Sequence, residues 1–161
     1  MLPEQLAEHP VVSPLDQRFP GAIIESKFAL GEVSLFIDPA RICELCSALK
    51  QDFAFEQLSG VTGVDWWPQE PRFEIVYQLH SISKNRRLRL KVRISEHDVL
   101  DSVTRIWRGA NWYEREVFDL FGVTFRNHPD LERIMMPADW EGHPLRKDYP
   151  VHGHRYSYAD E

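Results

Sequence analysis

The sequence has few of the features that mark membrane-spanning, exported or redox-active proteins. It contains only two cysteines among 161 residues. Its longest purely apolar runs are a few residues, whereas a transmembrane helix needs about 20. The N-terminus, Met-Leu-Pro-Glu-Gln, lacks the basic and apolar regions of a secretory signal. A chain with so few cysteines and no export signal is expected in a reducing, cytosolic compartment.

Fingerprints of nucleotide binding and of common hydrolases are also missing. The sequence holds no Gly-x-Gly-x-x-Gly, no phosphate-binding loop and no Gly-x-Ser-x-Gly elbow. A net charge of −6 argues against nucleic acid as a partner. The residues by themselves therefore predict a soluble domain with no evident active site.

Composition and periodicity predict an α+β fold. A hydrophobic content of 43% in 161 residues suffices for one core plus an appendage. Apolar and β-branched residues predict strands at 22–28, 32–37, 72–81 and 86–95, and a short kinked strand at 55–65. Helices are predicted at 38–52, 95–107 and 111–121, capped by Asp38, Ser95 and Asn111, with Glu114 at the capping-box position of the third. This order of elements predicts a mixed or antiparallel sheet with helices packed on one face.

The chain divides into three parts. Residues 1–20 contain four prolines and are expected to form a loosely structured N-terminal segment, residues 21–125 the α+β domain, and residues 126–161 an extended C-terminal arm. The stretch 114–150 passes from a short charged helix into residues dense in proline, glycine, tryptophan, histidine and paired charges, without a helical or strand period. Its apolar residues need cover that the stretch cannot supply. We therefore expect an arm that docks on another molecule.

Cys43 and Cys46 form a Cys-x-x-Cys pair. A dithiol redox site places this motif at a helix N-terminus, where the thiol pKa is lowered. Here the pair lies a turn inside the predicted helix, with Glu44 between the cysteines. A zinc site would need two more ligands, and no second cysteine pair exists. Buried structural thiols are favoured over redox or metal function.

The strand predicted at 86–95 is strongly basic and contains no acid before its end. A period of two places four cations on one face, namely Arg87, Arg89, Lys91 and Arg93. Proteins that bind single-stranded nucleic acid usually add aromatic residues to such a face, and this strand has none. Pairing with acids, in this chain or in a partner, is therefore the favoured interpretation.

Charged residues near the C-terminus offer a further alternative, a divalent metal or hydrolase site. The candidates are His128, His143, His152, His154, Asp130, Asp139, Glu141 and Asp148. No two of the histidines have the i, i+4 spacing of a metalloprotease, and the His-Pro dipeptides indicate turns. On the preceding helix, Glu114, Glu116 and Asp119 are interspersed with Arg115, which predicts a solvated or ion-paired face.

Three motifs carry a family resemblance. They read Glu-Arg-Glu-Val-Phe-Asp-Leu-Phe-Gly (114–122), His-Pro-Asp-Leu-Glu-Arg-Ile-Met (128–135) and Trp-Glu-Gly-His-Pro-Leu-Arg-Lys-Asp-Tyr-Pro (140–150). They resemble the signature of the C subunit of the proton-pumping NADH–quinone oxidoreductase, respiratory complex I. Residues 60–65, 72–77 and 85–92 are similar to that family as well, so the resemblance covers most of the chain from about residue 30. Glu132 stands where many members carry a basic residue.

The resemblance implies a non-catalytic structural subunit of the hydrophilic arm, with no cofactor in this chain. Two cysteines cannot supply the four thiolates of an ordinary iron–sulfur cluster. NADH, FMN, iron–sulfur clusters and quinone are expected elsewhere in the complex, which couples NADH oxidation by quinone to proton translocation. The implied partner is the large quinone-site subunit, the D subunit, together with other hydrophilic-arm subunits. The implied location is peripheral, on the cytoplasmic side of the inner membrane, with membrane contact only through the complex.

The surface expected to hold the partner lies in the three motifs. Its residues are Glu114, Arg115, Glu116, His128, Asp130, Arg133, Trp140, His143, Arg146, Lys147, Asp148 and Tyr149. Two alternatives stay open. One is the equivalent subunit of a related membrane-bound hydrogenase or ferredoxin–quinone oxidoreductase. The other is an independent metal-dependent hydrolase that uses the late histidines and aspartates.

Overall fold

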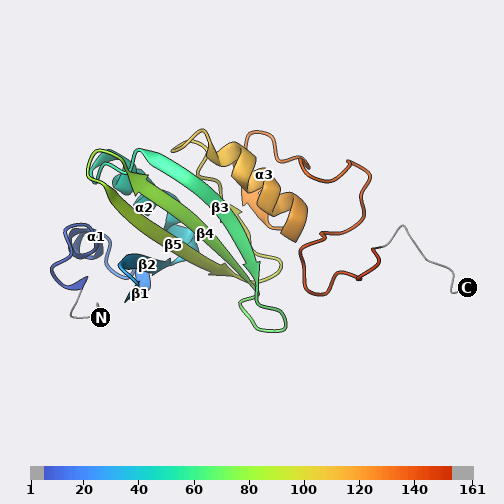
Figure 1. Ribbon diagram of the computed structural model, residues 1–161, viewed down its shortest axis with the longest axis horizontal. Helices are drawn as coiled ribbons and strands as arrows, with labels where there is room; N and C mark the ends of the chain where they lie inside the picture. The colour runs from blue at the N-terminus through green and yellow to red at the C-terminus, as the bar shows by residue number, and fades with distance from the viewer. Residues whose placement is uncertain (1–5, 154–161) are drawn as a thin grey trace, which may run out of the picture.

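A computed structural model describes residues 6–153, which form a mixed five-stranded sheet and three α-helices (Figure 1). The strand order is β1-β2-β5-β4-β3, and only the β2–β5 pair is parallel. The strands are β1 Ile23–Ala29, β2 Glu32–Ile37, β3 Gln57–Asp65, β4 Phe73–Ser81 and β5 Arg86–Ile94. The predicted α+β class and mixed sheet are confirmed. None of the helices in residues 6–153 is long and apolar enough to cross a membrane.

One face of the sheet forms the core, because apolar residues alternate along the central strands. On β5 the buried residues are Leu88, Leu90, Val92 and Ile94, as the sequence predicts. Helix α2 (Ile42–Gln51) and helix α3 (Ala110–Phe121) contribute their apolar stripes to the same core cluster. A Cβ at Gly63 would lie 2.9 Å from the Phe121 ring, so this glycine allows α3 to pack closely on β3.

The opposite face of the sheet carries the basic residues of β5, and acids of this chain pair with most of them. Glu74 on β4 is almost fully buried and accepts hydrogen bonds from Lys91 Nζ at 2.8 Å and Arg93 Nε at 3.1 Å. Arg89 pairs with Glu32 on β2 at 2.6 Å. The predicted pairing with acids within the chain is confirmed for these three cations.

The helix predicted at 95–107 is wrong. The expected local contact does form, since Asp98 Oδ2 accepts a hydrogen bond from the Ser95 amide at 2.7 Å. It closes a turn, and the chain then continues as strand β6 (Val99–Asp101), which pairs in parallel with β7 (Thr124–Arg126). The partner strand lies beyond α3, so a tertiary contact overrides the local helical pattern.

Three smaller features also differ from expectation. Helix α3 has Gly109 rather than Asn111 as its N-cap, with no side-chain cap, so Glu114 does not close a capping box. Strand β3 begins two residues later than predicted, and its predicted kink is present as an irregularity between Leu58 and Gly60. The N-terminal segment is less loose than expected, because it contains helix α1 (Val12–Arg18), whose Val12 and Leu15 are buried.

Candidate partner interface

The C-terminal segment, defined here as residues 127–153, contains no helix or strand and lies at the opposite end of the molecule from α1 (Figure 1). An extended arm separate from the domain is not evident in it. The segment instead returns to α3, since the Leu145 amide donates to the Leu120 carbonyl at 3.0 Å. Residues 154–161 lie outside the described part of the chain, and with them His154.

Asp119 on α3 is the main attachment point of this segment. Its fully buried carboxylate accepts three backbone N–H groups through Oδ2, from Ile134 at 2.9 Å, Met135 at 2.7 Å and Met136 at 2.8 Å. Arg133 Nη1 donates to Oδ1 at 2.6 Å. Burial by itself would raise the pKa of Asp119, but these donors outweigh it and lower the pKa. Of the two arrangements predicted for this face, solvated or ion-paired, Asp119 has the ion-paired one, with Arg133.

His143 extends the same attachment. Its Nδ1 lies 2.8 Å from the backbone carbonyl of Asp119, and Arg133 Nη2 donates to the Gly142 carbonyl at 2.9 Å. Gly122 ends α3 with φ +80°, and a Cβ there would lie 2.6 Å from the His143 ring. The glycine of the Leu-Phe-Gly motif thus permits both the helix end and the close approach of the histidine.

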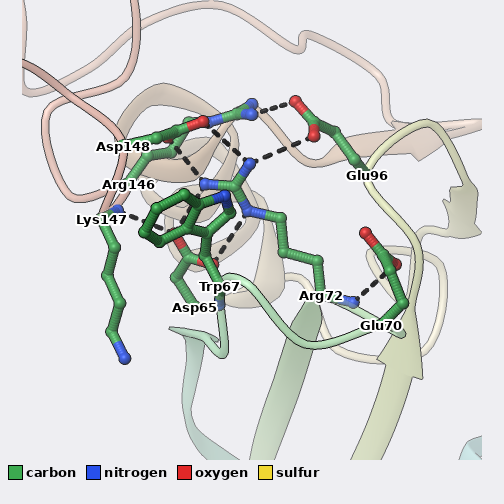
Figure 2. Close-up of polar contacts among 8 residues, drawn as sticks. All are labelled: Asp65, Trp67, Glu70, Arg72, Glu96, Arg146, Lys147 and Asp148. Carbon is green, nitrogen blue, oxygen red and sulfur yellow. Dashed lines mark hydrogen bonds and ion pairs between the residues drawn. The ribbon is translucent and has the colours of Figure 1, made fainter.

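A second attachment holds the far end of the segment at the β3–β4 connection (Figure 2). Arg72, whose side chain is 2% exposed, makes two hydrogen bonds of 2.9 Å to Asp65 and two of 3.0 and 2.7 Å to Asp148. Glu96 is a third acid at 3.1 Å, and Arg146 pairs with Glu96 and Asp148. The hydrogen bonds that Arg72 donates to Asp65 and Asp148 raise the pKa of Arg72 despite its burial. Two arginines and three carboxylates form one network.

Arg146, Lys147 and Asp148, which are predicted to hold a partner, also make contacts within the chain. Arg146 and Asp148 belong to the Arg72 network, and the Lys147 amide donates to Asp65 Oδ2 at 2.8 Å. Of these three residues, only Lys147 has a side chain that points away from the Arg72 network (Figure 2). Their main contacts within the chain therefore join the C-terminal segment to the sheet.

Of the remaining residues expected at the interface, some make contacts within the chain and others are exposed to solvent. Arg115 donates to the Glu132 carbonyl at 3.1 Å and lies 3.9 Å from Asp130, while the His128 side chain is buried near the Asn111 carbonyl. Tyr149 donates to the Glu141 carbonyl at 3.3 Å, and Trp140 is half-buried. Glu116, Asp130 and the Lys147 side chain are exposed.

Glu114 is also predicted at the partner interface. Its side chain lies on the inner side of α3 and is fully buried. Its carboxylate accepts hydrogen bonds from Ser102 Oγ at 2.6 Å and the Val103 amide at 2.8 Å. Burial raises the pKa of Glu114 to about 7, and the two hydrogen bonds oppose that rise. The group joins α3 to the loop that follows β6, a role that no local pattern indicates.

We expect Glu114 to make stability depend on pH near neutrality. A carboxyl group with a raised folded pKa stabilises the fold fully below its ordinary pKa, and that stability is lost as pH rises through the folded pKa. For a change from 4.5 to about 7, the free energy of unfolding should fall by about 3 kcal/mol between those pH values. Urea unfolding of Glu114→Gln and of the wild type from pH 5 to pH 8 checks this.

As pH rises, the wild type should lose stability relative to Glu114→Gln. Glu116→Gln is the matched control, because Glu116 is exposed on the same helix, and its difference from the wild type should stay flat. A flat difference for Glu114→Gln as well would contradict the raised pKa.

Cys46 lies in the core, and Cys43 is partly buried against it. Burial raises the pKa of the Cys43 thiol to about 11. Cys46 is fully buried, and its burial raises the pKa of its thiol well above the usual value. Cys43 Sγ lies 3.4 Å from the Ser102 carbonyl. Neutral thiols of this kind are poor nucleophiles and poor metal ligands. Among residues 6–153, no three histidine, cysteine or acidic side chains are grouped so as to hold a metal ion.

Sequence reasoning missed Asp119, Arg72, Asp65 and Glu96 as the residues that hold the segment. The nearest local signal was the β3–β4 hairpin, whose register places Asp65 opposite Phe73, next to Arg72. Nothing local indicates that Asp148 completes the same cluster.

Comparison with known proteins identifies the family of this chain. The family described as respiratory-chain NADH dehydrogenase, 30 kDa subunit, matches residues 35–155. The C subunit of NADH-quinone oxidoreductase from Geotalea uraniireducens is 46% identical over 86% of this chain and 85% of its own length. The same subunit from Geobacter metallireducens is 47% identical over 86% and 87%.

A solved structure is similar as well. It is a chain of the membrane-bound sulfane sulfur reductase, an archaeal respiratory membrane complex, with a TM-score of 0.76 and 26% identity over 88% of this chain and 84% of that one. The sequence similarity to the bacterial subunits is higher and covers most of both chains. The chain therefore belongs to the family of the respiratory-chain NADH dehydrogenase 30 kDa subunit, which is the C subunit of NADH-quinone oxidoreductase.

Proposed function

We propose that this subunit is a non-catalytic clamp, and that its C-terminal segment and the outer side of α3 hold the large quinone-site D subunit. The proposal rests on a contrast within the C-terminal segment, where polar groups hold the segment to the domain and apolar side chains stay exposed. Its polar groups attach it to the buried side chains of Asp119 and Arg72, while Met135 and Leu145 remain 58% and 53% exposed. Apolar side chains held outward on an anchored segment are suited to bind another protein.

The proposal assigns chemistry to the assembly rather than to this chain. The ionisable groups with shifted pKa values in the segment and α3 are engaged in hydrogen bonds that fold the chain. NADH, FMN, iron–sulfur clusters and quinone would be bound by other subunits. The complex would couple NADH oxidation by quinone to proton translocation, with this subunit peripheral on the cytoplasmic side of the membrane.

A second candidate is the equivalent subunit of a related respiratory complex with another electron donor or acceptor. The similarity to a chain of the sulfane sulfur reductase complex supports this second candidate. Purification of the native complex separates the two. Subunits that bind NADH and FMN, together with NADH–quinone turnover, support the first, and turnover only with another donor supports the second.

The clamp is tested by a double substitution of its exposed apolar residues. Met135→Asp with Leu145→Asp should weaken retention of this subunit in the purified complex roughly a thousandfold, since each buried side chain contributes about 2 kcal/mol. Quantitative mass spectrometry of the washed complex measures the retained subunit. NADH–quinone turnover should fall in parallel.

Ile82→Asp is the matched control, because Ile82 is 64% exposed in the β4–β5 connection, away from the segment. It should leave retention unchanged. Unaltered retention in the double variant would show that the segment is not the docking surface. Retention with lost turnover would place the segment nearer to the chemistry than a clamp requires.

A further inference from the structure

A groove of about 750 Å³ lies between the turn before α3, the start of α3 and the beginning of the C-terminal segment. Its lining includes Arg105, Arg108, Trp112, Arg115 and Asp130. None of these residues belongs to the Asp119 or Arg72 attachments. The groove is therefore distinct from these two attachments, although Arg115 also contacts the segment at Glu132 and Asp130.

The groove carries an excess of positive charge in a chain whose net charge is −6. Arg105 and Arg108 are exposed, and neither makes an ion pair with any residue between 6 and 153. Asp130 is the one acid in the lining, and it lies 3.9 Å from Arg115. Two guanidinium groups are thus left free for carboxylates, which arginine binds with two parallel hydrogen bonds.

Trp112 gives the groove an apolar side. Its side chain is 61% exposed, and the Arg115 guanidinium lies 5.3 Å from the centre of its ring. An indole this exposed contributes little to the core, whereas tryptophan and arginine dominate the binding energy of protein interfaces. The lining therefore combines the two residue types that are most effective in holding a protein partner.

We propose that this groove binds an acidic segment of a neighbouring subunit, with its carboxylates on Arg105 and Arg108 and an apolar side chain on Trp112. The inference rests on the proposed clamp function, because it places a second contact beside the first. Arg115 and Asp130 line the groove and also contact each other across α3 and the C-terminal segment. The groove is thus continuous with the proposed docking surface, and its charge is complementary to an acidic peptide.

The charge of the groove is tested in the assembled complex. Arg105→Glu with Arg108→Glu should lower the retention of the subunit at least about tenfold and release it at lower salt, since two attractive contacts become repulsive. The matched control is Lys84→Glu with Arg86→Glu, which changes the charge equally on the exposed β4–β5 hairpin. The control should be retained like the wild type.

The identity of the occupant is tested by photocrosslinking. Benzoylphenylalanine in place of Trp112 should crosslink, within the native complex, to a stretch of another subunit that contains several aspartates or glutamates, identified by mass spectrometry. A crosslink to lipid, to nucleic acid or to a neutral or basic stretch would overturn the proposal. So would unchanged retention of the Arg105→Glu, Arg108→Glu variant.

The two proposals fail in distinguishable ways. If Met135→Asp with Leu145→Asp releases the subunit and Arg105→Glu with Arg108→Glu does not, only the groove is wrong. If the wild-type subunit is absent from the complex, the clamp itself is wrong. Circular dichroism of each purified variant confirms that the loss of binding is not a loss of folding.

Discussion

Asp119→Ala should lower the free energy of unfolding by about 3–5 kcal/mol and release the C-terminal segment from α3. The substitution leaves three backbone N–H groups and the Arg133 guanidinium without the carboxylate that they share. Urea unfolding measures the free energy. Limited proteolysis measures the release, with new cleavage expected within residues 127–153 while the sheet stays intact.

Glu116→Ala is the control for Asp119→Ala, because it removes an exposed carboxylate from the same helix. It should change stability by less than about 0.5 kcal/mol. Asp119→Asn should fall between the two, since one carbonyl oxygen remains to accept hydrogen bonds while the charge is lost. Equal stabilities of Asp119→Ala and Glu116→Ala would contradict the role of Asp119 as an anchor.

Arg72→Met should cost about 3–5 kcal/mol at pH 7, because it leaves the buried carboxylate of Asp65 without its cation. The effect should depend on pH. Burial raises the pKa of Asp65, but Arg72 and two backbone amides lower it to about 2. A carboxylate with a lowered pKa stabilises the fold above its ordinary value of 3.8, and this stability is lost as pH falls toward 2. The destabilisation by Arg72→Met should therefore shrink over that range.

A double variant separates lost packing from uncompensated charge. Asp65→Asn combined with Arg72→Met removes both charges of the pair, and it should be more stable at pH 7 than Arg72→Met alone. Urea unfolding of the three proteins at pH 7 provides the comparison. If the double variant is no more stable than the single one, the unpaired charge of Asp65 is not the cause of the loss.

Local sequence signals are enough to predict the elements whose cause is local. Alternation places Leu88, Leu90, Val92 and Ile94 on the buried face of β5, because side chains on a strand point to opposite faces. Asp38 begins the helical region through its side-chain bond to the Ala40 amide, and Gly122 ends α3 in the left-handed conformation. The three motifs between residues 114 and 150 indicated the family. Each of these signals is contained within a few adjacent residues.

The directions and partners of the charged side chains, by contrast, depend on the folded chain. Residues 99–101 form a strand because β7 lies beside them, although their own pattern favours a helix. The sequence predicts a solvated or ion-paired face for Glu114 and Asp119 but not their burial. Both are buried because the loop after β6 and the C-terminal segment bring donors to them. Arg72 and Asp148 are 76 residues apart and form two hydrogen bonds. A charged side chain carries no local sign of its partner, so its burial depends on contacts that only the folded chain brings together.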